Sequence, residues 1–66
     1  MILKWEDTLA IAITLDDTHP AADPHQVLSS ELHRWICALK EFDDDPQRGD
    51  DAQLEMIRAA WIGERE

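Results

Sequence analysis

Carboxylates are the side chains of this 66-residue sequence whose type and spacing could do chemistry. Residues 43–55 contain six of them and a single base, Arg48. The six acids are Asp43, Asp44, Asp45, Asp50, Asp51 and Glu55. Like charges this close repel one another, which lowers the stability of the fold. The cluster therefore indicates that this segment binds a cation. The alternative is a solvated acidic loop with helix caps, because the last three acids suit the positive end of a following helix.

Metal binding is one function open to this acidic segment. Carboxylate oxygens are hard ligands suited to Mg²⁺, Ca²⁺, Mn²⁺ or Fe²⁺. An EF-hand is excluded, since a loop starting at Asp43 would have Arg48 where Gly is needed and Leu54 where Glu is needed. A zinc site is not indicated, because Cys37 is the only cysteine and the histidines lack ligand spacing. We expect any metal site to be exposed, built of carboxylates only, and of modest affinity.

A second, smaller acidic pair is Asp16-Asp17, at the end of the first predicted helix. Carboxylates there face the negative end of the helix dipole, which costs roughly 0.3–1 kcal/mol each. Two interpretations remain open. Either a base from another segment, a partner or an ion offsets the pair, or an exposed helix end tolerates it.

We predict that the protein is not an enzyme. An exposed acidic loop does not raise a carboxyl pKa by burial, as acid–base catalysis would need. Gly49 and Gly63 are the only glycines, so there is no phosphate-binding glycine loop. Cys37 lies among apolar residues, which favours a buried, unreactive thiol. The chain is also too short for a substrate pocket of the usual size.

The net charge of −9 restricts the class of partner. It disfavours nucleic acids and anionic membranes, and it favours basic protein surfaces and cations. Self-repulsion favours a monomer. One cysteine, no secretory signal and no apolar run near 20 residues predict a reduced, cytoplasmic protein without a membrane span.

The elements that must position these side chains are predicted to be helices, in one all-α domain of residues 1–66. No segment shows strand alternation. Four helices are expected, the second short and starting at Asp23-Pro24, a capping residue followed by proline at the first helical position. The other three run from Asp7 or Thr8 to Asp17, from Glu31 to Glu41 and from Asp51 to Ile62, with Gly63 just past the end. Asp7, Ser29 or Ser30, and Asp50 or Asp51 are the expected caps.

Apolar side chains at helical spacing predict the core. The three stripes are Leu9, Ala12 and Ile13, widened by Ile11 and Leu15; Leu32, Trp35, Ile36 and Leu39; and Leu54, Ile57 and Trp61, flanked by Ala60. Trp5, Trp35 and Trp61 are expected to meet in one core. A tight turn between the middle helices resembles a helix-turn-helix arrangement, with the acidic loop where a wing would lie. The second helix of that pair is neutral, which argues against DNA binding.

The sequence resembles the IscX (YfhJ) family over its whole length. The most specific match is the run H-x-W-I-C-x-L-x-x-F-D-D-D-P, residues 33–46. Further matches are Leu3-Lys4-Trp5 with Asp7, Pro20, Asp23-Pro24 with Val27, Leu54-Glu55-x-Ile57 with Trp61, and Glu64-x-Glu66.

The resemblance implies a modified winged-helix fold and a role in iron–sulfur cluster assembly. It implies binding to the cysteine desulfurase (IscS) through the acidic face, in competition with frataxin and the scaffold protein. It also implies weak binding of ferrous iron, with no tightly bound cofactor. The iron-binding positions carried over are Asp43, Asp44, Asp45, Asp51 and Glu55, whereas Asp50 joins the partner-binding set by proximity. An adaptor or regulator is the favoured function. A dedicated iron donor and an acidic module for another basic protein are the alternatives.

Overall fold

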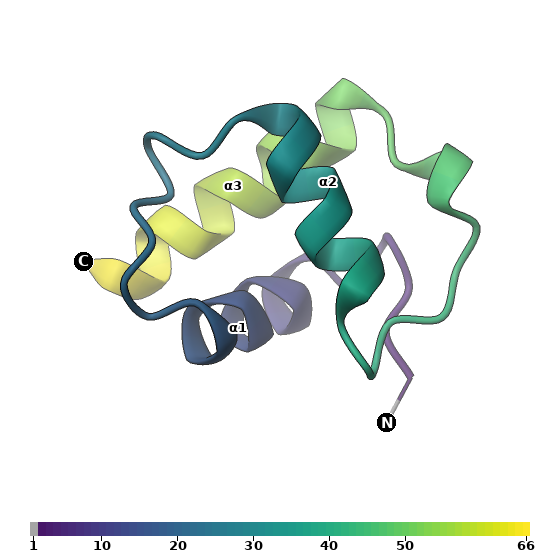
Figure 1. Cartoon of the computed structure of the whole chain (residues 1–66), viewed down its shortest axis with the longest axis horizontal. Helices are drawn as coiled ribbons and strands as arrows, with labels where there is room; N and C mark the ends of the chain where they lie inside the picture. The colour runs from purple at the N-terminus through teal and green to yellow at the C-terminus, as the bar shows by residue number, and fades with distance from the viewer. Residues whose placement is uncertain (1) are drawn as a thin grey trace.

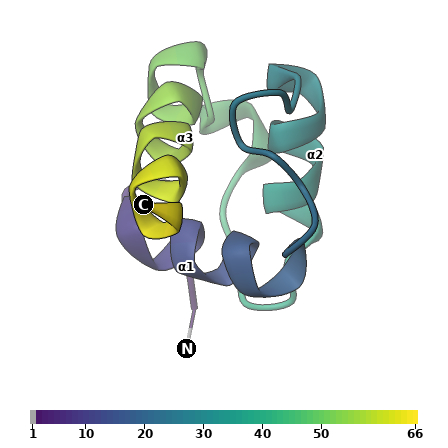
Figure 2. The same ribbon diagram turned by 90° about the vertical axis from the view of Figure 1, so that its left-hand side faces the viewer.

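Three α-helices form the protein in a computed structural model that describes residues 2–66. They are α1 (Thr8–Thr18), α2 (Ser29–Ala38) and α3 (Asp51–Arg65), with a 3₁₀ turn, η1 (Pro46–Arg48), in the loop before α3. α1 packs mainly against α3, and α2 crosses in front of α3 (Figure 1). Turned by 90°, α2 and α3 stand on opposite sides with α1 beneath them (Figure 2). The predicted all-α class is confirmed.

The predicted second helix does not form. After Asp23 the chain makes a turn, in which the Asp23 carboxylate accepts a hydrogen bond from the His25 backbone N–H at 2.9 Å. The Asp23 carbonyl accepts from Gln26 and Val27, which is one helical turn without continuation. Pro24 and Val27 are buried, so this segment acts as a packed connection between α1 and α2. The count is therefore three α-helices instead of four.

The winged-helix and helix-turn-helix details are not confirmed. Within residues 2–66 the only β contact is an isolated parallel bridge between Leu3 and Phe42. In it the Leu3 N–H donates to the Glu41 carbonyl at 2.7 Å, and the Asp43 N–H donates to the Leu3 carbonyl at 3.0 Å. The bridge fastens the N-terminal segment to the start of the acidic loop.

The core follows the predicted stripes of α2 and α3, but the stripe predicted for α1 was right only for Ala12, Ile11 and Leu15 and wrong for Leu9 and Ile13. Leu9 and Ile13 are 59% and 48% exposed, whereas Ile11, Ala12 and Leu15 are fully buried. Both sets have helical spacing, so periodicity could not decide which face α3 covers. α1 therefore keeps an apolar outer face.

The three tryptophans divide between two aromatic groups that border the same core. The Trp35 and Trp61 rings meet edge to face at 6.4 Å, and His19 stacks on Trp35 at 4.1 Å. Trp5 instead packs edge to face against Phe42 at 4.8 Å. The expectation that the three tryptophans meet in one core is confirmed, with Trp5 in the part of that core that lies under the acidic loop.

The helix ends show which predicted caps form. The Asp50 carboxylate caps α3 by accepting from the Gln53 N–H at 2.9 Å. Asp7 precedes α1, but its carboxylate accepts from the Lys4 N–H instead. Leu28 is the residue that precedes α2, and it makes no side-chain cap. Gly63 lies inside α3, which ends at Arg65 and not at Ile62.

None of the helices that the structure describes is long and apolar enough to cross a membrane.

Candidate functional site

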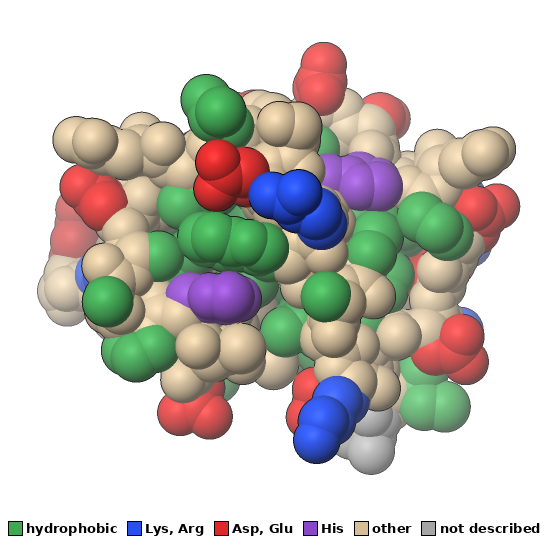
Figure 3. All heavy atoms as spheres, viewed as in Figure 1, with side chains coloured by type: hydrophobic (Ala, Val, Ile, Leu, Met, Phe, Trp, Pro, Cys, Tyr) green, Lys and Arg blue, Asp and Glu red, His purple; other side chains and the backbone are tan. Residues whose placement is uncertain are grey.

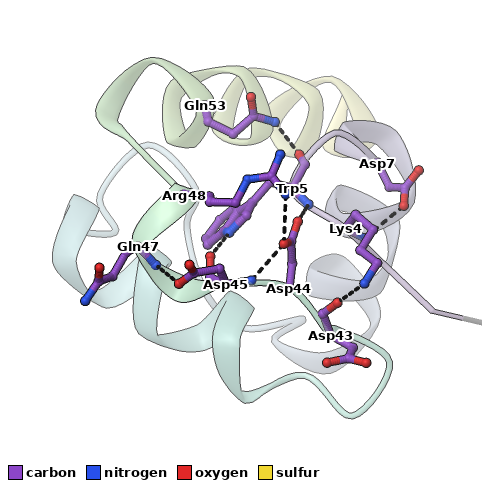
Figure 4. Close-up of polar contacts among 9 residues, drawn as sticks. All are labelled: Lys4, Trp5, Asp7, Asp43, Asp44, Asp45, Gln47, Arg48 and Gln53. Carbon is purple, nitrogen blue, oxygen red and sulfur yellow. Dashed lines mark hydrogen bonds and ion pairs between the residues drawn. The ribbon is translucent and has the colours of Figure 1, made fainter.

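The backbone of the acidic loop is held in place by side chains from distant parts of the sequence. The Trp5 indole Nε1–H donates to the Asp45 carbonyl at 2.7 Å, and the Lys4 ammonium donates to the Asp43 carbonyl. On the α2 side, His33 Nε2 lies 2.6 Å from the Pro46 carbonyl. Figure 4 shows the contacts to Lys4 and Trp5 converging on the loop. The N-terminal segment and α2 therefore fix its conformation jointly.

Asp44 points into this network. Its Oδ2 accepts from the Trp5 backbone N–H at 3.1 Å, and its Oδ1 accepts from the Asp45 N–H at 2.7 Å and from Arg48 Nη1 at 3.2 Å. The side chain is only 8% exposed. The Trp5 N–H, followed by the Asp45 N–H and the positive charges of Arg48 and Lys4, holds the Asp44 pKa below its usual range.

Asp43, Asp45 and Asp51 are exposed and have no ion-pair partner within residues 2–66. The Asp43 carboxylate points away from the network around Asp44 (Figure 4). The Asp45 carboxylate accepts from the Gln47 N–H at 3.0 Å, which shapes the start of η1 and leaves its negative charge unneutralised.

The remaining two predicted site residues are engaged locally. Asp50 caps α3, as described above. Glu55 lies one turn further along α3 and pairs with Arg58 at 3.1 Å, with its side chain 62% exposed. The Arg58 side chain is only 14% exposed, so the accessible member of the pair is the Glu55 carboxylate, which can also meet an external cation.

The six carboxylates share one segment but do not converge on a point. Within residues 2–66 no three His, Cys, Asp or Glu side chains are grouped closely enough to hold a metal ion. An ion at this segment would be held by one or two carboxylates and water. The five-residue iron set stays a prediction.

The sequence reasoning missed the residues that support the loop, chiefly Gly49, Trp5 and Gln53. A Cβ at Gly49 would overlap the Trp5 indole, coming 2.8 Å from Cε2. The Gln53 side-chain amide donates to the Trp5 carbonyl, which joins α3 to the same tryptophan. A glycine in an otherwise polar loop was the one available signal of a close approach.

The family model described as iron-sulphur cluster assembly matches residues 3–66. The chain belongs to this family, the IscX family. An uncharacterized protein of Pseudomonas aeruginosa is 53% identical to the chain over 66 residues, the full length of both. The protein therefore has a role in iron–sulfur cluster assembly.

Several residues that carry the IscX resemblance are the ones that build the loop. Trp5 and His33 hold its backbone, Asp44 lies inside it, and Pro46 begins η1. In this IscX-family chain the motif of residues 33–46 thus contains residues that position the acidic segment, as well as some of the acids themselves.

Cys37 belongs to the same motif but lies apart from the carboxylates. It is half-buried, and burial raises the pKa of its thiol. Its Sγ lies 3.9 Å from His33 Nδ1. The predicted full burial of this thiol is therefore not confirmed, and its low reactivity stays a prediction.

The negative charge of the second acidic pair, Asp16-Asp17, is partly neutralised by a base. Arg65 Nε donates to Asp16 Oδ1 at 2.6 Å, and the Trp61 indole N–H lies 3.4 Å from the same oxygen. A base from another segment, one of the predicted explanations, therefore accounts for Asp16. Asp17 is exposed and forms no ion pair within the described residues.

Acidic side chains extend well beyond the loop. Three of the fifteen form ion pairs within residues 2–66, namely Asp16, Asp44 and Glu55. On the face seen in Figure 3, the Asp and Glu side chains lie mostly around the edge, and hydrophobic, histidine and cationic side chains lie nearer the middle. The negative field therefore surrounds a less acidic centre on this side.

Proposed function

We propose that the protein binds the cysteine desulfurase (IscS) through the exposed carboxylates of residues 43–55 and thereby regulates the rate of cluster assembly. The observation that carries the proposal is the fixed loop, in which Asp43, Asp45 and Asp51 are exposed without a Lys or Arg partner in the described chain. A loop already ordered from inside loses little freedom on binding, which favours affinity. Uncompensated charges favour fast, salt-sensitive association with a basic surface.

Within this proposal the six acids have two roles. Asp44 and Asp50 hold the loop and the start of α3, since their carboxylates accept backbone N–H groups. Asp43, Asp45, Asp51 and Glu55 meet the basic surface of the desulfurase. Frataxin and the scaffold protein would compete for that basic surface, because its positive charges can pair with one acidic partner at a time.

The test replaces the charges of Asp43 and Asp45 without changing their shape. In Asp43→Asn/Asp45→Asn, the amide oxygen at position 45 can still accept from the Gln47 N–H. We expect desulfurase binding to weaken by about tenfold or more, since close charge pairs across an interface are worth about 1.5 kcal/mol or more. The dissociation constant is measured by biolayer interferometry, with circular dichroism to verify the fold.

Glu64→Gln/Glu66→Gln is the matched control. It removes two negative charges from exposed positions at the far end of α3. Its dissociation constant should stay near that of the unmodified protein. Equal weakening in both variants would show that net charge alone determines binding, and would refute a docking site in the loop.

The same exposed carboxylates support weak binding of ferrous iron. We expect a low affinity, because no three acidic, histidine or cysteine ligands are grouped within residues 2–66. Anaerobic titration with Fe²⁺, repeated in a modest excess of Mg²⁺, measures the selectivity. Displacement by Mg²⁺ is the expected result. Retention of iron would favour the alternative, a dedicated iron donor.

A further inference from the structure

An open cleft of about 540 Å³ lies beside the C-terminal half of α1, outside the acidic segment 43–55. Leu3, Ile13 and Pro20 supply its apolar lining. The cleft is bounded by the N-terminal segment, by α1 and the turn after it, and by the turn that follows α2. Because Leu3 is buried and Ile13 is half exposed, the cleft has an apolar floor with one accessible aliphatic wall.

The rim of the cleft is acidic. Asp16, Asp17 and Glu41 line it together with Thr14. Asp16 is already paired with Arg65, and the Thr14 hydroxyl donates to the Ala10 carbonyl within α1. Asp17 and Glu41 are exposed and form no ion pair within residues 2–66. Two uncompensated carboxylates thus flank an apolar floor.

The outer face of α1 extends this surface. Leu9 lies one turn before Ile13 on the same face and is 59% exposed. Asp17 follows Ile13 by one turn, and Glu6 lies just before the helix; both are exposed. Two aliphatic side chains with an acidic one at either end therefore line this face next to the cleft.

We propose that this cleft is a second docking surface, which binds a segment of another protein presenting Lys or Arg beside an aliphatic side chain. The aliphatic group would contact Ile13 and Leu3, while the cation would pair with Asp17 and Glu41. This complementarity decides against other occupants. A second copy of the chain also has a charge of −9, and anionic lipid or nucleic acid would meet the same acidic rim. The inference goes beyond the proposed desulfurase site, since no residue of the cleft belongs to segment 43–55.

A short peptide of sequence Lys-Leu-Arg-Leu-Lys, blocked at both ends, is a direct probe. We expect saturable chemical-shift changes at the amides of Ile13, Asp17 and Glu41 in a ¹⁵N-edited NMR titration. Replacing both leucines of the peptide by serine, or all three cations by glutamate, should weaken binding, because each change removes one half of the complementarity.

Two variants and their controls test the site on the protein. Ile13→Ser and Asp17→Asn/Glu41→Gln should each weaken peptide binding by about fivefold or more. The controls are Met56→Ser, which removes an exposed apolar side chain from α3, and Glu64→Gln/Glu66→Gln, which removes two charges elsewhere. Both controls should bind as the unmodified chain does.

Three results would overturn the inference: equal weakening by the controls, shift changes spread over all acidic segments, or a stable dimer in sedimentation that buries the cleft. Asp43→Asn/Asp45→Asn should keep its peptide affinity. Failure of the desulfurase proposal would therefore leave the peptide result unaffected.

Discussion

Neighbouring aspartates in the D-D-D run have different surroundings. The chain bends at Asp44, whose carboxylate turns inward to the Trp5 N–H, while Asp43 and Asp45 are exposed. The inward carboxylate accepts from the N–H groups of Trp5 and Asp45, and the first of these belongs to a buried residue that needs a hydrogen-bond partner. One acid thus orders the loop that presents the two beside it.

The lowered pKa of Asp44 predicts an acid sensitivity of the fold. Its ordinary value is 3.8, and the folded value lies below that. The unfolded chain therefore binds the proton more readily, so the stabilisation is present above the ordinary value and is lost as pH falls through the folded value. In Asp44→Asn this part of the acid dependence should disappear, and stability at neutral pH should fall.

Urea midpoints of the unmodified protein and Asp44→Asn, measured from pH 7 down to pH 2.5, make the comparison. Asp43→Asn is the control, because its exposed carboxylate accepts no hydrogen bond from the described part of the chain. An acid dependence that persists unchanged in Asp44→Asn would contradict the assigned role.

At the scale of elements, sequence periodicity predicted the buried face of a helix correctly where the helix has only one apolar face. Leu32 and Ile36 on α2, and Ile57 on α3, were predicted to be buried and are. α1 has apolar residues on two faces, and only its packing against α3 decides between Ile11 and Ile13. The helix expected after Asp23 stops at one turn because α2 already begins at Ser29, which leaves too few residues to extend it.

The candidate site shows the same limit. The acids of residues 43–55 were predicted as a group, and Asp50, one of the two residues predicted to cap the last helix, is its cap. That Asp44 is internal depends on Trp5, about forty residues earlier in the chain, so no local pattern could reveal it. Long-range contacts of this kind are what a single sequence leaves undetermined.

The two glycines give a matched test of the contact between the loop and the N-terminal segment. Gly49→Ala should destabilise the protein by about 1–3 kcal/mol, because the added methyl group would overlap the Trp5 indole. Gly63→Ala should instead stabilise it by about 0.5–1 kcal/mol, since this exposed position inside α3 has nothing within 4 Å of the new Cβ.

Chemical denaturation monitored by tryptophan fluorescence measures both variants. Gly49→Ala should also shift the Trp5 indole N–H signal in NMR spectra, whereas Gly63→Ala should not. A Gly49→Ala variant as stable as the unmodified protein, or more so, would contradict a close approach of Gly49 to Trp5 that limits packing.

On the scale of the whole molecule, charge acts against the fold and in favour of binding. Fifteen acidic side chains face six Lys and Arg, and three of those bases are already used in ion pairs within residues 2–66. The resulting self-repulsion destabilises the compact state, while the same field attracts a basic partner. Stability and affinity should consequently respond to salt in opposite directions.

Raising NaCl from about 20 mM to about 500 mM shortens the screening length severalfold and should raise the urea midpoint. Over the same range the association rate with the desulfurase should fall steeply, because screening weakens long-range attraction before contact. Sucrose at matched osmolality is the control, since it strengthens folding without screening charge. A urea midpoint that decreases with salt would mean that the three ion pairs outweigh the repulsion among the remaining carboxylates.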